Sequence, residues 1–570
     1  MPERQFAELA AGGGSDEAVA FLERSERARR LLLLRTLLDR LDALPTSITP
    51  PAEAWCALKA AAAQAPESVD QLLLAPGTGS WIAHMLRRLH GSATGPALWA
   101  EAGHLCALAV TASLRANTDA DLLVPLTNGG LFLPDLGLAR LPDAAPGLTV
   151  GRARTGGGEL TLNGPGRNGG SVALTIRPAT TPLRAEQLAG RSDDVQETSW
   201  FPLRTLTHHT PAGPVPILLD DLDPYRDLDD PLPPARLDDE EALAWQGLFE
   251  EAASLLAGRN QGPRGPGPGR IDPATIRSVV PWGRTTIQPP ALPTVQVSAS
   301  SGDAFGAMVI ARPSSALALA ETLVHEFQHS KLAALLHLFP LLDDDRAECY
   351  YAPWRADPRH LTGLLHGAYA FTGVAGFWRD RLADAPDAAG AETASYHFAL
   401  RRTQCRLVVR TLLTSARLTA QGHALVSGLA RTLDQWLREP VSPAALARAR
   451  TAAALHRTEW RLRNVVPDSA ATYLPGNLGF RPDRTSWPDL RTQAFAVRPI
   501  APRTADEYLA AADPAGALAL YIDELAADAS EPHALAGWIV ARAAVAPGRA
   551  ARRMLARPEL VRQLPSGPHE

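Results

Sequence analysis

Three features are scarce in this 570-residue sequence: lysine, cysteine and long apolar runs. Only Lys59 and Lys331 are lysines among the 56 basic residues, so nearly every cation is an arginine. The four cysteines contain no C-x-x-C pair, which excludes a sequence-evident zinc knuckle or disulfide framework and favours a reducing compartment. No uncharged apolar run approaches the roughly 18 residues of a membrane span, so no such span is expected.

An excess of positive charge is also missing, since the formal net charge is −5. General nucleic-acid binding requires a clustered basic surface and is therefore not expected. Residues 1–11 carry charges early and lack the apolar core of a secretory signal, so a cytoplasmic location is expected. The hydrophobic content of 46 % is typical of globular proteins, and the chain length predicts two to four domains.

The periodicity of apolar residues changes along the chain and predicts an α+β fold that is predominantly helical, with a β-rich region in the N-terminal half. The predicted regions are a helical part at 1–118, a β-rich part at 119–235, a mainly helical catalytic part at 236–463, and a proline-rich linker with C-terminal helices at 464–570. The expected strands are 122–126, 130–133, 148–152, 159–162, 171–177, 201–207, 215–219, 278–281, 294–300 and 307–312. The expected later helices are 237–257, 314–339, 361–383, 392–437 (with a break allowed), 443–462 and 505–564, and residues 259–273 form an expected flexible insertion.

The most informative segment is His325-Glu326-Phe327-Gln328-His329, an H-E-x-x-H motif within a helical apolar pattern. Residues i and i+4 lie about 40° apart around a helix, so His325 and His329 project from one face and could share a metal ion. Glu326 would lie beside the same site. The alternative is a pair of hydrogen-bonded core histidines.

A metal site needs a third protein ligand, and two candidates follow the motif. Glu348 has nearly the spacing found in gluzincin peptidases, and His366 lies in an otherwise small and apolar helix, where a histidine without a partner is costly. The alternatives are an ordinary loop acid for Glu348 and a core histidine bonded to a carbonyl for His366.

The segment 350–359, Tyr-Tyr-Ala-Pro-Trp-Arg-Ala-Asp-Pro-Arg, contains two prolines that exclude a regular helix. It presents Arg355 and Arg359 on a stiff connection, which suits bidentate binding of a dicarboxylate or a phosphate. The alternative is that one or both arginines form only structural ion pairs, with Asp357 or Asp380.

The order of these motifs resembles the HEXXH motif-containing peptide modification family. The resemblance covers about residues 304–381 strongly and 218–226 more weakly. It rests on His325–His329 with Lys331-Leu332 and Leu335-Leu336, Tyr351-Ala352-Pro353-Trp354-Arg355, Asp357-Pro358-Arg359, Gly363-Leu364-Leu365-His366-Gly367 and Phe377-Trp378-Arg379.

The resemblance implies an iron(II)- and 2-oxoglutarate-dependent oxygenase with a non-cupin metal site on a zincin-like helix. Such an enzyme hydroxylates a β-carbon, notably of aspartate, in a ribosomally made precursor peptide during RiPP maturation, and a radical SAM enzyme can be its partner. His325, His329 and His366 would hold the iron, although the usual triad is two histidines and a carboxylate. Glu326 would orient a ligand or a water, and Tyr351, Arg355 and Arg359 would bind 2-oxoglutarate.

Two other functions remain open at this point. A zincin-type zinc peptidase acting on the same class of peptide would use Glu326 as the general base on a metal-bound water. A non-catalytic helical binding scaffold would use the motif only for structure. Metal retention and the products formed from a peptide distinguish the three possibilities.

Overall fold

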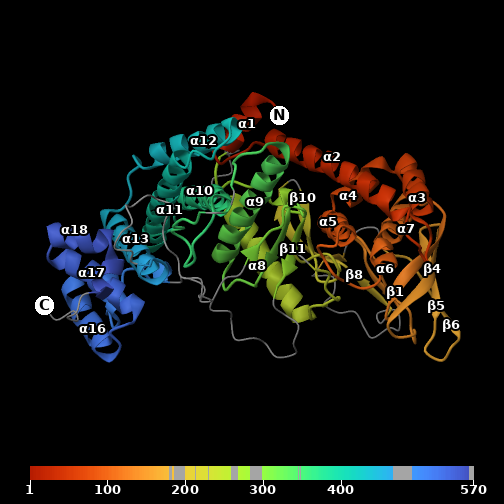
Figure 1. Ribbon diagram of the computed structural model, residues 1–570. Coiled ribbons are helices and arrows are strands. Elements are labelled where there is room, and N and C mark those ends of the chain that lie inside the picture. The colour runs from red at the N-terminus through yellow and green to blue at the C-terminus, as the bar shows by residue number, and fades with distance from the viewer. Residues whose placement is uncertain are drawn as a thin grey trace. The chain divides into compact units, whose positions relative to one another are not determined.

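The computed structural model describes residues 1–178, 183–184, 199–211, 213–228, 230–257, 267–282, 298–344, 346, 348–466 and 491–563 (Figure 1). The chain forms two compact units, each assembled from segments that are not consecutive in sequence. Unit 1 consists of Met1–Ala18, Arg259–Arg270 and Phe339–Glu570, and unit 2 of Val19–Gly258 and Ile271–Leu338. The predicted α+β fold, predominantly helical with a β-rich N-terminal half, is confirmed.

The first helices of unit 2 follow the proline and leucine pattern of the sequence. They are α2 (Asp16–Leu41), α3 (Pro51–Gln64), α4 (Pro66–Leu74), α5 (Pro76–His90), α6 (Leu98–Ala102) and α7 (His104–Ala116). Helices α3, α4 and α5 each begin with a proline, which suits the first helical position because its missing N–H has no helical partner there.

An antiparallel sheet of seven strands follows in the order β6-β5-β4-β1-β2-β3-β8. Its strands are β1 (Ala120–Thr127), β2 (Gly130–Leu133), β3 (Gly137–Arg140), β4 (Leu148–Gly156), β5 (Glu159–Pro165), β6 (Ser171–Ile176) and β8 (Trp200–Pro202). Asn128 and Gly129 join β1 to β2 with φ of 50° and 75°, the conformation that a two-residue hairpin turn requires.

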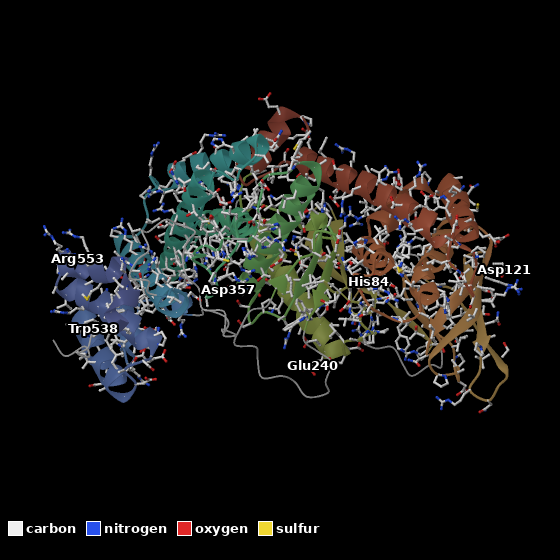
Figure 2. All side chains as sticks on the ribbon, in the orientation of Figure 1. His84, Asp121, Glu240, Asp357, Trp538 and Arg553 are labelled. Atoms are coloured by element: carbon white, nitrogen blue, oxygen red, sulfur yellow. The ribbon has the colours of Figure 1, made fainter. Side chains whose placement is uncertain are left out.

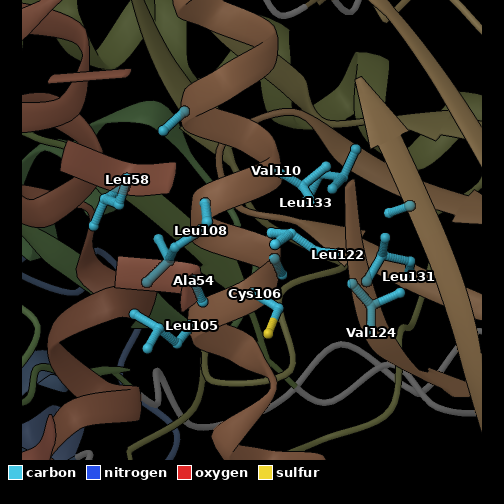
Figure 3. Packing of buried hydrophobic residues seen from close by; sticks show 14 of the residues in the cluster. Ala54, Leu58, Leu105, Cys106, Leu108, Val110, Leu122, Val124, Leu131 and Leu133 are labelled. Carbon is cyan, nitrogen blue, oxygen red and sulfur yellow. The ribbon is translucent and has the colours of Figure 1, made fainter. Parts of the chain in front are cut away.

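Helix α7 is the centre of the apolar core beside this sheet. Figure 3 shows Leu105 and Leu108 of α7 near Ala54 and Leu58 of α3. On the sheet side, the same core is completed by Val110 of α7 with Leu122, Val124, Leu131 and Leu133. All these side chains are at most 3 % exposed except Leu122, at 5 %. This packing explains why α7 has no polar face.

The second sheet of unit 2 carries the helix with the H-E-x-x-H motif. Its order is β12-β13-β11-β10-β9-β7, with parallel pairing of β10 with β11 and of β11 with β13, and antiparallel pairing of β12 with β13. The strands are β7 (Leu183–Arg184), β9 (Arg204–Thr210), β10 (Gly213–Leu219), β11 (Ser278–Pro281), β12 (Ser298–Ala299) and β13 (Ala307–Ile310). Helix α9 (Ala316–Leu338) contacts β12, β13 and helix α8 (Asp239–Ala257) (Figure 1).

Unit 1 is helical in its described residues. Its elements are α1 (Glu3–Ala10), α10 (Leu361–Ala383), α11 (Ala388–Thr414), α12 (Ala420–Trp436), α13 (Pro443–Asn464), α14 (Arg491–Ala494), α15 (Ala505–Ala510), α16 (Pro514–Ala527), α17 (Pro532–Val545), α18 (Arg549–Ala556) and the 3₁₀ helix Pro558–Gln563. The N-terminal segment is part of unit 1, and the Tyr369 hydroxyl of α10 donates a hydrogen bond to the Leu9 carbonyl of α1 at 2.9 Å.

Most expected elements are present, with a few differences. Strand β3 was not expected, the expected strand 201–207 divides into β8 and β9, and the helix expected at 392–437 is broken between α11 and α12. Residues 258–266, part of the expected strand 294–300, and most of the 464–502 linker lie outside the described residues. Among the described helices, none combines the length and apolar character needed to cross a membrane.

Candidate functional site

The H-E-x-x-H motif lies on a helix, as the sequence predicts. It occupies the middle of α9, which belongs to unit 2. The Nε2 atoms of His325 and His329 are 3.1 Å apart, and their ring planes meet at 79°. Two nitrogens bound to one ion at about 2.0–2.1 Å each lie roughly 3 Å apart. The spacing therefore suits a shared transition-metal ion, and it equally suits a hydrogen bond between the two rings.

The protonation state of the pair also suits a metal. Both histidines are half-buried. The surrounding protein lowers the pKa of His329 to about 4, because burial disfavours the charged ring. His329 is therefore neutral at physiological pH, and the neutral imidazole is the form that binds metals.

The side chain of Glu326 is buried and accepts hydrogen bonds from two serines. Ser298 lies in β12, and Ser300 directly follows that strand. The Ser298 hydroxyl donates to Oε1 at 2.7 Å and the Ser300 hydroxyl donates to Oε2 at 2.8 Å. Side chains alternate along an extended chain, so residues 298 and 300 face the same side. Burial raises the pKa of Glu326, and the two hydrogen bonds partly oppose this rise.

These serines are functional candidates that the sequence analysis did not name. The strand expected at 294–300 contains Ser298 and Ser300 two residues apart, which is the only signal the sequence offered. A strand beside a motif helix can present such a pair to a buried carboxylate, but nothing local identifies which carboxylate. In the structure Glu326 is only 1 % exposed, and both of its oxygens are engaged.

Lys331 lies just after the motif and is only 2 % exposed. Its Nζ atom is 5.9 Å from the centre of the Phe327 ring, and burial lowers the pKa of the ammonium group to about 7. A lysine on the interior side of α9 indicates that this helix is surrounded on more than one face.

The arginine segment belongs to unit 1, between α9 and α10 in the sequence. Tyr350 and Arg359 form an antiparallel bridge with backbone hydrogen bonds of 2.8 and 3.0 Å, which closes the segment into a loop. Arg355 Nε lies 2.8 Å from one Asp357 oxygen, and Arg359 Nε lies 3.3 Å from the other. Arg355 and Arg359 therefore both form ion pairs with Asp357, which the sequence analysis gave as the alternative to anion binding. The other acid named there, Asp380, pairs with Arg270.

The two guanidinium groups share the Asp357 carboxylate. Arg355 and Arg359 remain 37 % and 36 % exposed, respectively. Burial and the neighbouring Arg355 lower the pKa of Arg359, and Asp357 opposes this effect.

The hydroxyl of Tyr351 has a protein partner. It lies 2.8 Å from Nδ1 of His456 on α13, and the Tyr351 ring packs edge-on against Trp460. These contacts fasten the arginine segment to α13. They assign Tyr351 a positioning role within unit 1, and its predicted contact with a cofactor stays a prediction.

The two candidates for a third metal ligand both lie in unit 1. His366 is half-buried on α10, and Glu348 accepts a hydrogen bond from the Tyr350 hydroxyl. Within the part of the chain that the structure describes, no group of three or more histidine, cysteine, aspartate or glutamate side chains is arranged to hold a metal ion. The histidine pair of α9 is therefore the core of the candidate site, and the third ligand stays a prediction.

A comparison of the sequence with protein-family models and with curated proteins finds no match.

Proposed function

We propose that this protein is an iron(II)- and 2-oxoglutarate-dependent oxygenase that hydroxylates a β-carbon, notably of aspartate, in a ribosomally made precursor peptide. The observation that carries the proposal is the pair of imidazole Nε2 atoms, which lie 3.1 Å apart on α9. Beside them, both carboxylate oxygens of Glu326 accept hydrogen bonds from serine hydroxyls. A radical SAM enzyme acting on the same peptide is the proposed partner.

His325 and His329 would hold the iron, with His366 as the proposed third ligand. Bound iron and 2-oxoglutarate would together activate dioxygen, so that one oxygen atom enters the peptide C–H bond while 2-oxoglutarate yields succinate and carbon dioxide. The neutral state of His329 supports this role, because a protonated imidazole has no lone pair to donate.

Arg355 and Arg359 are the proposed partners of the distal carboxylate of 2-oxoglutarate. A guanidinium binds a carboxylate through two parallel hydrogen bonds, and both guanidinium groups of this segment already lie beside one carboxylate, that of Asp357. Tyr351 supports this function indirectly by holding the segment against His456.

A zinc peptidase is the second candidate, because H-E-x-x-H on a helix next to an antiparallel strand suits that chemistry as well. In a peptidase the glutamate must reach a metal-bound water and take its proton. The hydroxyls of Ser298 and Ser300 occupy both oxygens of Glu326, and this favours a positioning role over that of a general base.

The decisive experiment measures products with each metal. Full-length protein is loaded anaerobically with iron(II) and supplied with 2-oxoglutarate, and oxygen is then admitted. We expect oxygen-dependent succinate even without peptide, and the gain of one oxygen atom by a precursor peptide, for which a short peptide gene beside the gene of this protein would be the candidate. A zinc-loaded sample is tested in parallel for cleavage of fluorescein-labelled casein.

His325→Ala is expected to abolish both succinate formation and iron retention, measured by elemental analysis. His423→Ala is the matched control, because His423 is an exposed histidine on α12. Zinc-dependent cleavage that disappears in Glu326→Gln would establish the peptidase instead. If the folded protein retains no metal and forms no succinate, the result would support a non-catalytic binding scaffold.

A further inference from the structure

The C-terminal part of unit 1 contains a long stretch of sequence without any acidic residue. Residues 532–557 include five arginines and no aspartate or glutamate, whereas the whole chain has 61 acidic and 56 basic residues. The stretch forms α17, α18 and the turn between them. Four of its arginines are exposed, and their side chains make no hydrogen bond or ion pair within the described residues: Arg542, Arg549, Arg552 and Arg553.

Three of these arginines lie on one face of α18. Successive residues turn by about 100° around a helix, so Arg549, Arg552 and Arg553 fall within an arc of about 100°. The opposite face of α18 packs against the apolar core of unit 1 through Met554 and Leu555. The three arginines are called the arginine face here, and Figure 2 labels Arg553 at the surface of unit 1.

The arginine face lies at the end of α18 where cations are least favourable. The N-terminus of a helix carries a partial positive charge and is stabilised by acidic side chains. In α18 the first turn contains Arg549 and Arg552 and no acidic residue, and Gly548 provides no side-chain cap. The next acid in the sequence, Glu559, is 2 % exposed and pairs with Arg461 at 2.7 Å. The arrangement therefore costs stability, and a bound anion would offset this cost.

The surroundings of the arginine face do not suit a nucleic acid or a lipid surface. Single-stranded nucleic acids bind largely by stacking their bases on aromatic rings. The tryptophan of the 532–557 stretch, Trp538, is only 8 % exposed. An amphipathic helix binds a lipid surface through its apolar face, and the apolar face of α18 is already packed against the core.

A second copy of this chain would need free carboxylates of its own. The most acidic stretch of unit 1, residues 505–531, has seven acidic residues and no lysine or arginine. Several of these acids already have a role within unit 1. Asp513 caps α16, Glu531 caps α17, and Asp506 pairs with His533. Self-association therefore explains the arginine face less well than a separate acidic partner.

We propose that the arginine face of α18 binds a short peptide segment rich in aspartate or glutamate. A guanidinium donates two parallel hydrogen bonds to a carboxylate, so three exposed arginines on one face suit a segment with neighbouring carboxylates. The proposal does not depend on the oxygenase function, and its test needs no metal.

Fluorescence anisotropy on the full-length protein tests the proposal. The probe is a fluorescein-labelled peptide of six glutamates. A peptide of six glutamines and a thymidine oligonucleotide with as many negative charges as the probe carry the same label. We expect saturable binding of the glutamate peptide that weakens as salt is added, because salt screens exposed charges. The glutamine peptide should not bind, and the oligonucleotide should bind more weakly than the glutamate peptide.

Replacing all three residues of the arginine face with glutamine is expected to weaken the glutamate peptide about tenfold or more, because three exposed charge pairs are lost. Glutamine favours the helical state nearly as well as arginine, so α18 should stay folded. Arg553→Gln alone is expected to weaken binding about threefold, and this variant tests the site should the triple variant not fold.

The matched control makes the same three changes at Arg410, Arg431 and Arg450. These arginines are exposed on α11, α12 and α13, and their replacement changes the net charge equally. The control variant should bind the glutamate peptide like the parent protein.

The proposal is overturned if the glutamate peptide does not saturate, if the glutamine peptide binds equally, or if the variants of the arginine face bind like the control variant. Tighter binding of the oligonucleotide that the triple variant loses would overturn it in favour of a nucleic acid. Sedimentation velocity of the protein alone provides the remaining test. Self-association that the triple variant abolishes would overturn the proposal in favour of a second copy of this chain.

Discussion

At the scale of single residues, the contact of Glu326 with two serines decides how the motif can work. A carboxylate that is 1 % exposed needs hydrogen bonds to compensate for the lost water, and Ser298 and Ser300 supply one to each oxygen. These bonds also connect α9 to β12. The motif glutamate therefore contributes to the structure of unit 2 whatever chemistry the histidines support.

Ser298→Ala combined with Ser300→Ala is expected to destabilise the protein by about 1–3 kcal/mol for each acceptor left unsatisfied. Urea unfolding followed by far-ultraviolet circular dichroism measures the loss. Ser254→Ala removes an exposed helical hydroxyl and should change the free energy of unfolding by less than about 0.5 kcal/mol. A double variant as stable as the parent would show that Glu326 does not need these hydroxyls.

A second residue-scale feature is the imidazole of His533 in unit 1. Its Nδ1 atom lies 3.0 Å from Glu459 and its Nε2 atom 3.1 Å from Asp506. Burial alone would lower the pKa of His533, but the hydrogen bonds and charges of Asp506 and Glu459 outweigh burial and raise it to about 9. The protonated ring therefore joins α17 to α13 and α15.

The sign of the pH effect follows from this raised pKa. The folded state binds the proton more tightly than the unfolded chain, whose histidine pKa is about 6.5. The stabilisation is complete below about pH 6.5 and is lost as the pH rises to about 9. We expect the stability advantage of the parent over His533→Asn to shrink by on the order of 3 kcal/mol across that range.

Urea unfolding at several pH values between 6 and 10 measures the stability advantage. His423→Asn, at an exposed histidine, should run parallel to the parent protein at every pH. A constant difference between parent and His533→Asn would mean that His533 does not carry the proton.

At the scale of elements, α9 is stabilised mainly by burial. Its apolar residues face both the sheet and neighbouring helices, so Leu319, Leu323 and Phe327 are all 2 % exposed or less. Phe327 packs edge-to-face against Phe305, with ring centres 6.3 Å apart. This packing fixes the helix that carries both histidines.

Phe327→Ala is expected to cost about 3–5 kcal/mol, because it removes a buried aromatic ring and leaves a cavity. Thermal and urea unfolding measure the change. Leu32→Ala, at a side chain that is 69 % exposed on α2, is the control and should stay within about 0.5 kcal/mol of the parent. An equally small loss for Phe327→Ala would contradict the packing of α9.

Elements with a strong period were predictable from the sequence. Helix α10 matches its expected range, and β2 does likewise, because both have clear apolar patterns and turn residues at their ends. Strand β3 is as short as β2 but was missed, because its sequence Gly-Leu-Ala-Arg has one large apolar side chain where β2 has three. The histidine pair followed from helix geometry alone, whereas the serine contact with Glu326 depends on tertiary packing that no local pattern contains.

At the scale of the whole molecule, the order of segments explains what the sequence could not reveal. Consecutive regions were predicted, but each compact unit combines segments far apart in the chain. The motif belongs to one unit, and the candidates for the third ligand and the anion site belong to the other. Spacing in sequence therefore carries no information on how His366 relates to His325 and His329.

The scarcity of lysine provides a test of the fold of unit 2. Lys59 is exposed on α3 and Lys331 is 2 % exposed on α9. Reaction with an amine-specific acetylating reagent should modify Lys59 at once. We expect Lys331 to react at least about a thousandfold more slowly, because exposing it requires α9 to separate from its neighbours.

Peptide mass spectrometry follows both sites in one sample, with Lys59 as the internal control. In urea sufficient to unfold the protein the two rates should become equal, and equal rates without urea would refute the burial of α9.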